Sequence, residues 1–112
     1  VALLEQAASQ CPTSLELRNQ HAHVLATSRE PALRDGRRAA ALALEVTRAD
    51  RHNPAYLRTL SAALAELGEG PRALEIARQA LRVVETRGDP PALVAAYRAQ
   101  LEALERGESL RE

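Results

Sequence analysis

The sequence predicts an all-α fold built from antiparallel helical hairpins. Residues 53–85 contain two stretches whose apolar and small side chains recur at helical spacing, separated by a Gly-Glu-Gly-Pro turn. Nearly all apolar residues of the chain are Ala or Leu, which is typical of packed helices, and no segment alternates with the two-residue period of a strand. The residues expected to face each other across this hairpin are Leu57, Leu60, Ser61 and Leu64 in the first helix and Ala73, Ile76, Ala77, Ala80 and Leu81 in the second.

The length and the charge of the chain limit its organisation and its partners. With 112 residues it forms one small domain. Its formal net charge is zero, which argues against a nucleic-acid partner, and no apolar run is long enough to insert into a membrane. Because the chain opens with Val1 and not with Met, we expect it to be a segment of a longer protein.

The first two predicted helices are separated by a proline. Residues 1–10 favour helix throughout and stop before a Cys-Pro pair, because a residue that precedes proline is pushed towards extended conformations. Thr13 and Glu16 have the spacing of a capping box, so a second helix should cover about residues 14–26. Residues 27–35 contain a proline and should form a connection with a short helical turn.

The next two helices have recognisable entry signals. Asp35 or Gly36 should cap a helix that reaches about residue 49. Asn53, followed by a proline at the first helical position, should open a helix that ends at Gly68. A Gly-Pro pair then opens a helix that should continue to about Thr86.

The last predicted helix begins after Gly88 at a pair of prolines and ends at Gly107. Its apolar residues recur at helical spacing and should pack back on the preceding helices. This stripe consists of Leu93, Val94, Tyr97, Leu101 and Leu104.

Two of the predicted helices repeat one pattern at a fixed interval. The pairs Ala39 and Ala73, Leu42 and Ile76, Ala43 and Ala77, and Val46 and Ala80 are each 34 residues apart. This period, with small residues where helices touch, resembles the tetratricopeptide repeat (TPR), whose unit is a helix-turn-helix. The resemblance is carried by Leu57, Leu60, Ser61, Leu64, Gly68, Ala73, Ala77 and Ala80. Ala77 departs from the motif, which usually has an aromatic residue there.

The resemblance divides the single domain into four parts. Residues 1–11 match the second helix of a partial repeat, residues 13–50 a repeat with an extended internal loop, residues 53–86 a full repeat, and residues 90–107 a capping helix. The resemblance implies antiparallel hairpins that stack as a right-handed superhelix, an α-α solenoid.

In TPR domains the first helix of each repeat commonly lines a concave groove that holds an extended peptide or a partner helix. The resemblance therefore implies a groove lined by Asn19, His23, Arg58, Ala62 and Glu66, with Glu16, Ala26 and Ala55 at matching positions. Asn19 and Arg58 have the chemistry to bind a backbone amide or a carboxylate. The alternative is that all of these are ordinary exposed helix residues.

The sequence carries no motif for catalysis, for a cofactor or for a metal ion. No strained G-x-S-x-G turn presents a serine, and no glycine-rich loop follows a strand. His21 and His23 are two residues apart on a predicted helix and point in different directions, so they cannot share one ion. We expect His21 to pack between helices and His23 to face the groove or solvent.

We therefore expect a protein-protein interaction scaffold without enzymatic activity, which binds a peptide or a partner helix. The alternative is a structural or oligomerising C-terminal tail of a larger bacterial membrane or regulatory protein. A homodimer is expected through residues 1–10, where Val1, Leu3 and Leu4 form an apolar face whose covering helix the chain lacks. The alternative is a marginal monomer in which these residues fray into solvent.

Overall fold

The computed structural model describes residues 14–108, and this part of the chain is all-α. It contains five α-helices and one short 3₁₀-helix, and no strand occurs within these residues. The elements are α2 (Leu15–Thr27), η1 (Pro31–Leu33), α3 (Gly36–Ala49), α4 (Pro54–Glu66), α5 (Gly70–Arg87) and α6 (Pro91–Glu105). The predicted all-α fold class is confirmed. The helix predicted for residues 1–10, with its proposed contact through Val1, Leu3 and Leu4, lies outside the described residues.

Polar side chains cap the first three described α-helices, α2, α3 and α4. The Asp35 carboxylate accepts a hydrogen bond from the main-chain N–H of Arg38 at 3.2 Å, and Asn53 Oδ1 accepts from the N–H groups of Ala55 and Tyr56. These bonds satisfy N–H groups that have no partner inside the helix. The cap of α2 differs from the prediction by one position, since Ser14 occupies it and accepts from the N–H of Leu17 at 3.4 Å.

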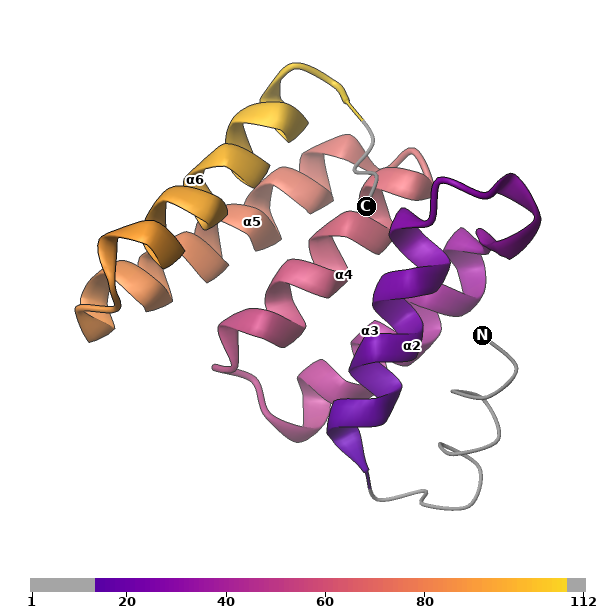
Figure 1. Cartoon of the computed structure of the whole chain (residues 1–112), viewed down its shortest axis with the longest axis horizontal. Coiled ribbons are helices and arrows are strands. Elements are labelled where there is room, and N and C mark those ends of the chain that lie inside the picture. Colours follow the sequence, from indigo (N-terminus) through magenta and orange to yellow (C-terminus); the bar gives the residue numbers. More distant parts are fainter. Residues whose placement is uncertain (1–13, 109–112) are drawn as a thin grey trace.

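Consecutive helices run antiparallel and pack against each other, and α2 also packs beside α4 (Figure 1). Glycines allow the two tightest reversals: Gly68 follows α4 with φ 81° and Gly88 ends α5 with φ 71°. Only glycine adopts this left-handed conformation without a steric cost. The resulting order places α4 at the centre of the described residues, in contact with α2, α3 and α5.

The core lies along α4, which has more buried residues than any other described helix. Alanines form the contacts on the neighbouring helices: Ala39 and Ala43 of α3 and Ala73 of α5 have no exposed surface. A methyl side chain lets two helix backbones approach closely, so much of this core is backbone and alanine. The predicted hairpin stripes are buried as expected, except that Ile76 and Leu81 keep part of their surface exposed.

The predicted stripe on α6 is right for four of its five residues. Tyr97 and Leu104 are buried and Val94 and Leu101 partly so, but Leu93 is 39% exposed. Leu93 lies in the first turn of α6 and borders an open hollow beside the start of α4. The helical period placed Leu93 on the packing side of α6, but its position beside this hollow leaves it partly exposed.

Candidate functional site: a groove between helices α2, α4 and α6

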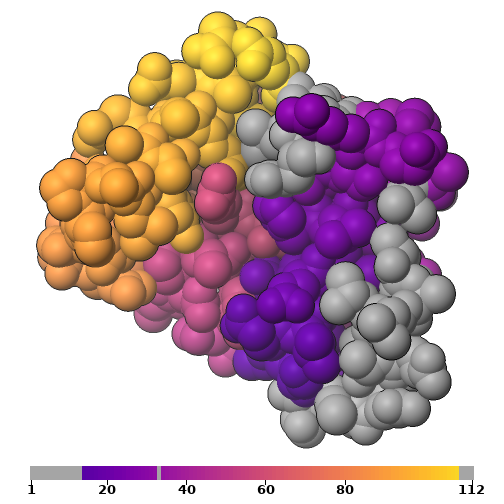
Figure 2. All heavy atoms as spheres, in the orientation of Figure 1, coloured from indigo at the N-terminus to yellow at the C-terminus, as the bar shows by residue number. Residues whose placement is uncertain are grey.

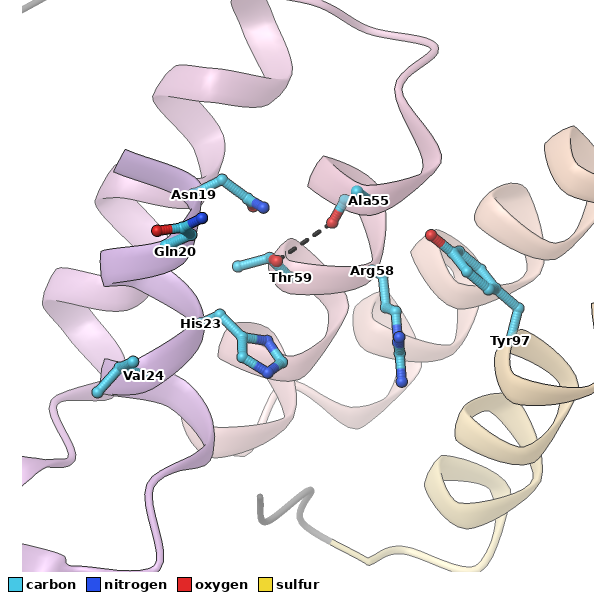
Figure 3. Close-up of a pocket in the computed structure, with 8 residues that line it drawn as sticks. All are labelled: Asn19, Gln20, His23, Val24, Ala55, Arg58, Thr59 and Tyr97. Atoms are coloured by element: carbon cyan, nitrogen blue, oxygen red, sulfur yellow. Dashed lines mark hydrogen bonds between the residues drawn. The ribbon is translucent and has the colours of Figure 1, made fainter. Parts of the chain in front are cut away.

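A groove with a volume of about 380 Å³ opens between α2, α4 and α6. Figure 2 shows α4 at the bottom of the hollow between α2 in indigo and α6 in orange and yellow. Its lining residues are Asn19, Gln20, His23 and Val24 of α2, Ala55, Arg58 and Thr59 of α4, and Tyr97 of α6 (Figure 3). The groove therefore collects residues from three helices that are separated in the sequence.

Arg58 is the charged residue at the middle of this groove. Its Nε donates a hydrogen bond to Gln100 Oε1 at 2.5 Å, and its guanidinium carbon lies 5.3 Å from the centre of the Tyr97 ring. The hydrogen bond and the cation–π contact fix the plane of the guanidinium from two sides. The two terminal nitrogens keep their N–H donors, and no carboxylate within residues 14–108 forms an ion pair with Arg58.

Gln100 is itself buried and fixed by hydrogen bonds. It is 8% exposed, and its Nε2 donates to the main-chain oxygen of Arg58 at 3.0 Å and to Ser61 Oγ at 2.7 Å. Ser61 in turn donates to the same Arg58 oxygen at 2.8 Å. The side-chain amide of Gln100 therefore has partners for both its oxygen and its nitrogen, as a buried amide requires.

Burial raises the pKa of the Tyr97 hydroxyl above its ordinary value, although the nearby cations of Arg58 and Arg87 lower it in part. Tyr97 is 6% exposed, and its hydroxyl stays neutral at physiological pH. Tyr97 therefore contributes an uncharged aromatic face to the groove, on which the guanidinium of Arg58 rests.

Asn19 brings an unused acceptor to the groove. Its Oδ1 is buried and has no hydrogen-bond partner within the described residues, and Figure 3 shows its side chain directed from α2 towards α4. Across from it, the Thr59 hydroxyl donates to the main-chain oxygen of Ala55 at 3.1 Å. A buried oxygen without a partner is costly, and it belongs to a half-buried side chain that lines the groove.

The structure brings Asn19, His23, Ala55 and Arg58 together in the groove. Ala62 and Glu66 are not there, and these two assignments are wrong. Ala62 is 2% exposed in a core cluster with Leu25, Ala26, Ala39 and Ala63. The Oε1 of Glu66 lies 3.9 Å from Nε of Arg34, at the far end of α4.

The reason is the angle between α2 and α4. Their C-terminal ends approach each other (Figure 1), and Ala26 and Ala62 belong to the same buried cluster there. Their N-terminal halves diverge and leave the groove open. Of the matching positions, Glu16 is exposed without lining the groove and Ala26 is 1% exposed in the core.

Sequence reasoning missed the contribution of α6. Tyr97 was assigned only to the packing stripe, and Gln100 was assigned no role. Gln100 lies three residues after Tyr97 and therefore on the same side of α6, which was the available signal. Arg58 and Gln100 are 42 residues apart, so no local sequence motif could predict their contact.

The two histidines of α2 occupy different environments. His21 is 2% exposed, as expected for a residue packed between helices, whereas His23 lines the groove. Within residues 14–108, no group of three or more His, Cys, Asp or Glu side chains is arranged to hold a metal ion. None of the helices in this range combines the length and the apolar character needed to cross a bilayer.

Comparisons of the chain with protein-family models, with curated proteins and with solved structures gave no match.

Proposed function

We propose that the chain is a TPR-type interaction module that binds an extended peptide of a partner protein in the groove between α2, α4 and α6. The observation that carries the proposal is Arg58, a half-buried cation that Gln100 and Tyr97 hold in place and that has no carboxylate partner within the described residues. Orienting an arginine in advance lowers the entropy that a ligand must otherwise supply on binding.

The repeat character of the proposal is supported by matching burial at the 34-residue interval. Ala39 and Ala73 are both fully buried, and Ala43 and Ala77 are at most 4% exposed. The first helices of the two candidate repeats, α2 and α4, pack side by side. Neighbouring first helices form the concave face in arrays of helical repeats, which is where the groove lies in this proposal.

The chemistry of the groove favours a peptide that carries an acidic side chain. A guanidinium binds a carboxylate through two parallel hydrogen bonds, and the terminal nitrogens of Arg58 are the available donors. The side-chain amide of Asn19 adds a polar group to the lining of the groove. Val24 and Ala55 provide apolar surface beside these polar groups. In this proposal the module holds its partner and catalyses no reaction.

The test is a selection from a random peptide library displayed on phage, with the immobilised chain as bait. We expect enrichment of peptides with an acidic residue, and a loss of affinity of about tenfold or more in the variant Arg58→Gln, because a charge-assisted hydrogen-bond pair is removed. Asn19→Ala should also weaken binding.

The matched control is Arg48→Gln, which removes an equally charged residue from the exposed end of α3. Circular dichroism and thermal melts establish that the variants are folded. The proposal fails if no peptide is enriched over an empty surface, or if the selected peptides bind Arg58→Gln as tightly as the parent chain.

A further inference from the structure

A second hollow, with a volume of about 570 Å³, shares no lining residue with the groove. It lies between the link from α3 to α4 and one side of α5. Its lining residues are Arg51 and His52 of the link, Leu57 of α4, and Gln79, Arg82, Val83, Thr86 and Arg87 of α5. Asn19, His23, Arg58 and Tyr97 line the groove and not this second hollow.

The lining of this basic hollow combines apolar and cationic side chains. Leu57 is 3% exposed and Val83 is partly buried, and both belong to the apolar cluster that also contains Val84 and Tyr97. A hollow with this composition offers a site for one aliphatic side chain of a ligand.

Its charges are all of one sign. Arg51, Arg82 and Arg87 line the hollow, and no Asp or Glu does. Arg87 lies 3.5 Å from Asp89, but Arg51 and Arg82 form no ion pair within residues 14–108. Since the whole chain has as many acidic as basic residues, this clustering is a local departure from a neutral average.

We propose that the basic hollow is a docking surface for an acidic protein segment, in which an aliphatic residue is flanked by Asp or Glu. Charge complementarity carries the argument, because guanidinium groups with spare N–H donors pair best with planar carboxylates. Leu57 and Val83 receive the aliphatic side chain, while Arg51 and Arg82 bind the flanking carboxylates.

A nucleic acid fits this surface less well. No aromatic side chain lines the hollow, so unpaired bases have nothing to stack on. Sequence-independent binding to a phosphate backbone depends on many simultaneous cationic contacts, whereas this hollow supplies three arginines in a neutral chain.

The probe for the test is a fluorescein-labelled peptide, Glu-Asp-Leu-Glu-Glu-Gly, titrated with the chain and followed by fluorescence anisotropy. We expect saturable binding that weakens as salt is added. The double variant Arg51→Glu/Arg82→Glu should lose affinity by about tenfold or more, since two attractive pairs become repulsive. Nitrogen-15 NMR spectra should show the peptide shifting the amide signals of Leu57 and Val83.

The matched control is Arg29→Glu/Arg37→Glu, which makes the same charge change at two exposed residues outside the hollow. It should retain the parent affinity, and the amide shifts at Leu57 and Val83 distinguish binding here from binding in the groove. If the charge-reversed variant Arg51→Glu/Arg82→Glu does not fold, the milder variant Arg51→Gln/Arg82→Gln is used in its place.

Three results would overturn the docking surface. One is the absence of saturable binding, and another is equal binding by the charge-reversed and control variants. The third is a preference for the neutral peptide Gln-Asn-Leu-Gln-Gln-Gly or for a single-stranded oligonucleotide over the acidic peptide, which would assign the arginines to a different ligand or to none.

Discussion

Arg58 and Gln100 bind each other in both directions across the interface of α4 and α6. Nε of Arg58 donates to Oε1 of Gln100, and Nε2 of Gln100 donates to the main-chain oxygen of Arg58. The same Nε2 reaches Ser61 Oγ on the next turn of α4. One amide thus attaches α6 to the central helix and orients the cation of the groove.

We predict that Gln100→Ala lowers the free energy of unfolding by about 1–3 kcal/mol, because it removes three hydrogen bonds and leaves Nε of Arg58 without its partner. Denaturant unfolding measures the change. Gln79→Ala, at an exposed position of α5, is the control and should change stability by less than about 0.5 kcal/mol. Equal stability of the two variants would contradict the role of Gln100.

A second prediction concerns the alanine contacts between α4 and α5. Ala80 is 1% exposed and packs in a cluster with Leu57, Val84 and Tyr97. Ala80→Leu should destabilise the chain by about 1–3 kcal/mol, because the added carbons must displace packed atoms. Ala99→Leu, on the exposed side of α6, provides the comparison in the same unfolding experiment. If Ala80→Leu changes the free energy of unfolding by less than about 0.5 kcal/mol, the helices are not tightly packed at Ala80.

Helix positions were predictable from the sequence because local chemistry determines them. The Asn53-Pro54 entry of α4 and the Gly88 end of α5 involve residues close in sequence, whose caps and φ angles act without help from the rest of the fold. The α2 cap was misplaced by one residue because Thr13 and Ser14 both carry a hydroxyl, and a pattern does not rank two adjacent candidates.

The sequence predicted only those groove residues whose position depends on the face of a single helix. The spacing of Asn19, His23 and Arg58 identified the correct side of α2 and α4. It did not reveal where along their length the helices converge, so Ala62 and Glu66 were assigned to an opening that the structure closes. Gln100 was missed because its role depends on the position of α6 against α4, which local spacing does not encode.

A third prediction tests the left-handed residue at the end of α5. Gly88 has φ 71°, and a Cβ added there would meet no atom within 4 Å, so only backbone strain opposes a side chain. Gly88→Ala should therefore cost about 1 kcal/mol. Gly70→Ala, at the start of α5 with equally open surroundings and no positive φ, should have little effect. Thermal or denaturant unfolding measures the change in stability. If both variants lose the same stability, the positive φ of Gly88 is not the cause of the loss.

The last prediction concerns alkaline pH and the two tyrosines. Burial raises the pKa of Tyr97, and burial together with the carboxylates of Glu16 and Asp50 raises that of Tyr56. The folded chain therefore keeps its phenolic protons to a higher pH than the unfolded chain, whose tyrosines ionise near about 10. Stability from this source is fully present below about pH 10 and is lost as the pH rises through the folded-state pKa values.

We expect the free energy of unfolding to fall above about pH 10 in the parent chain and to fall less in Tyr56→Phe/Tyr97→Phe, because phenylalanine has no proton to lose. Near-ultraviolet difference absorbance, followed in the folded chain and in denaturant, should show phenolate forming later in the folded chain. Two results would contradict this prediction. The tyrosines could ionise at the same pH in the folded and unfolded chains, or the double variant could lose stability as steeply as the parent. In either case, burial of the phenols does not cause the loss of stability at alkaline pH.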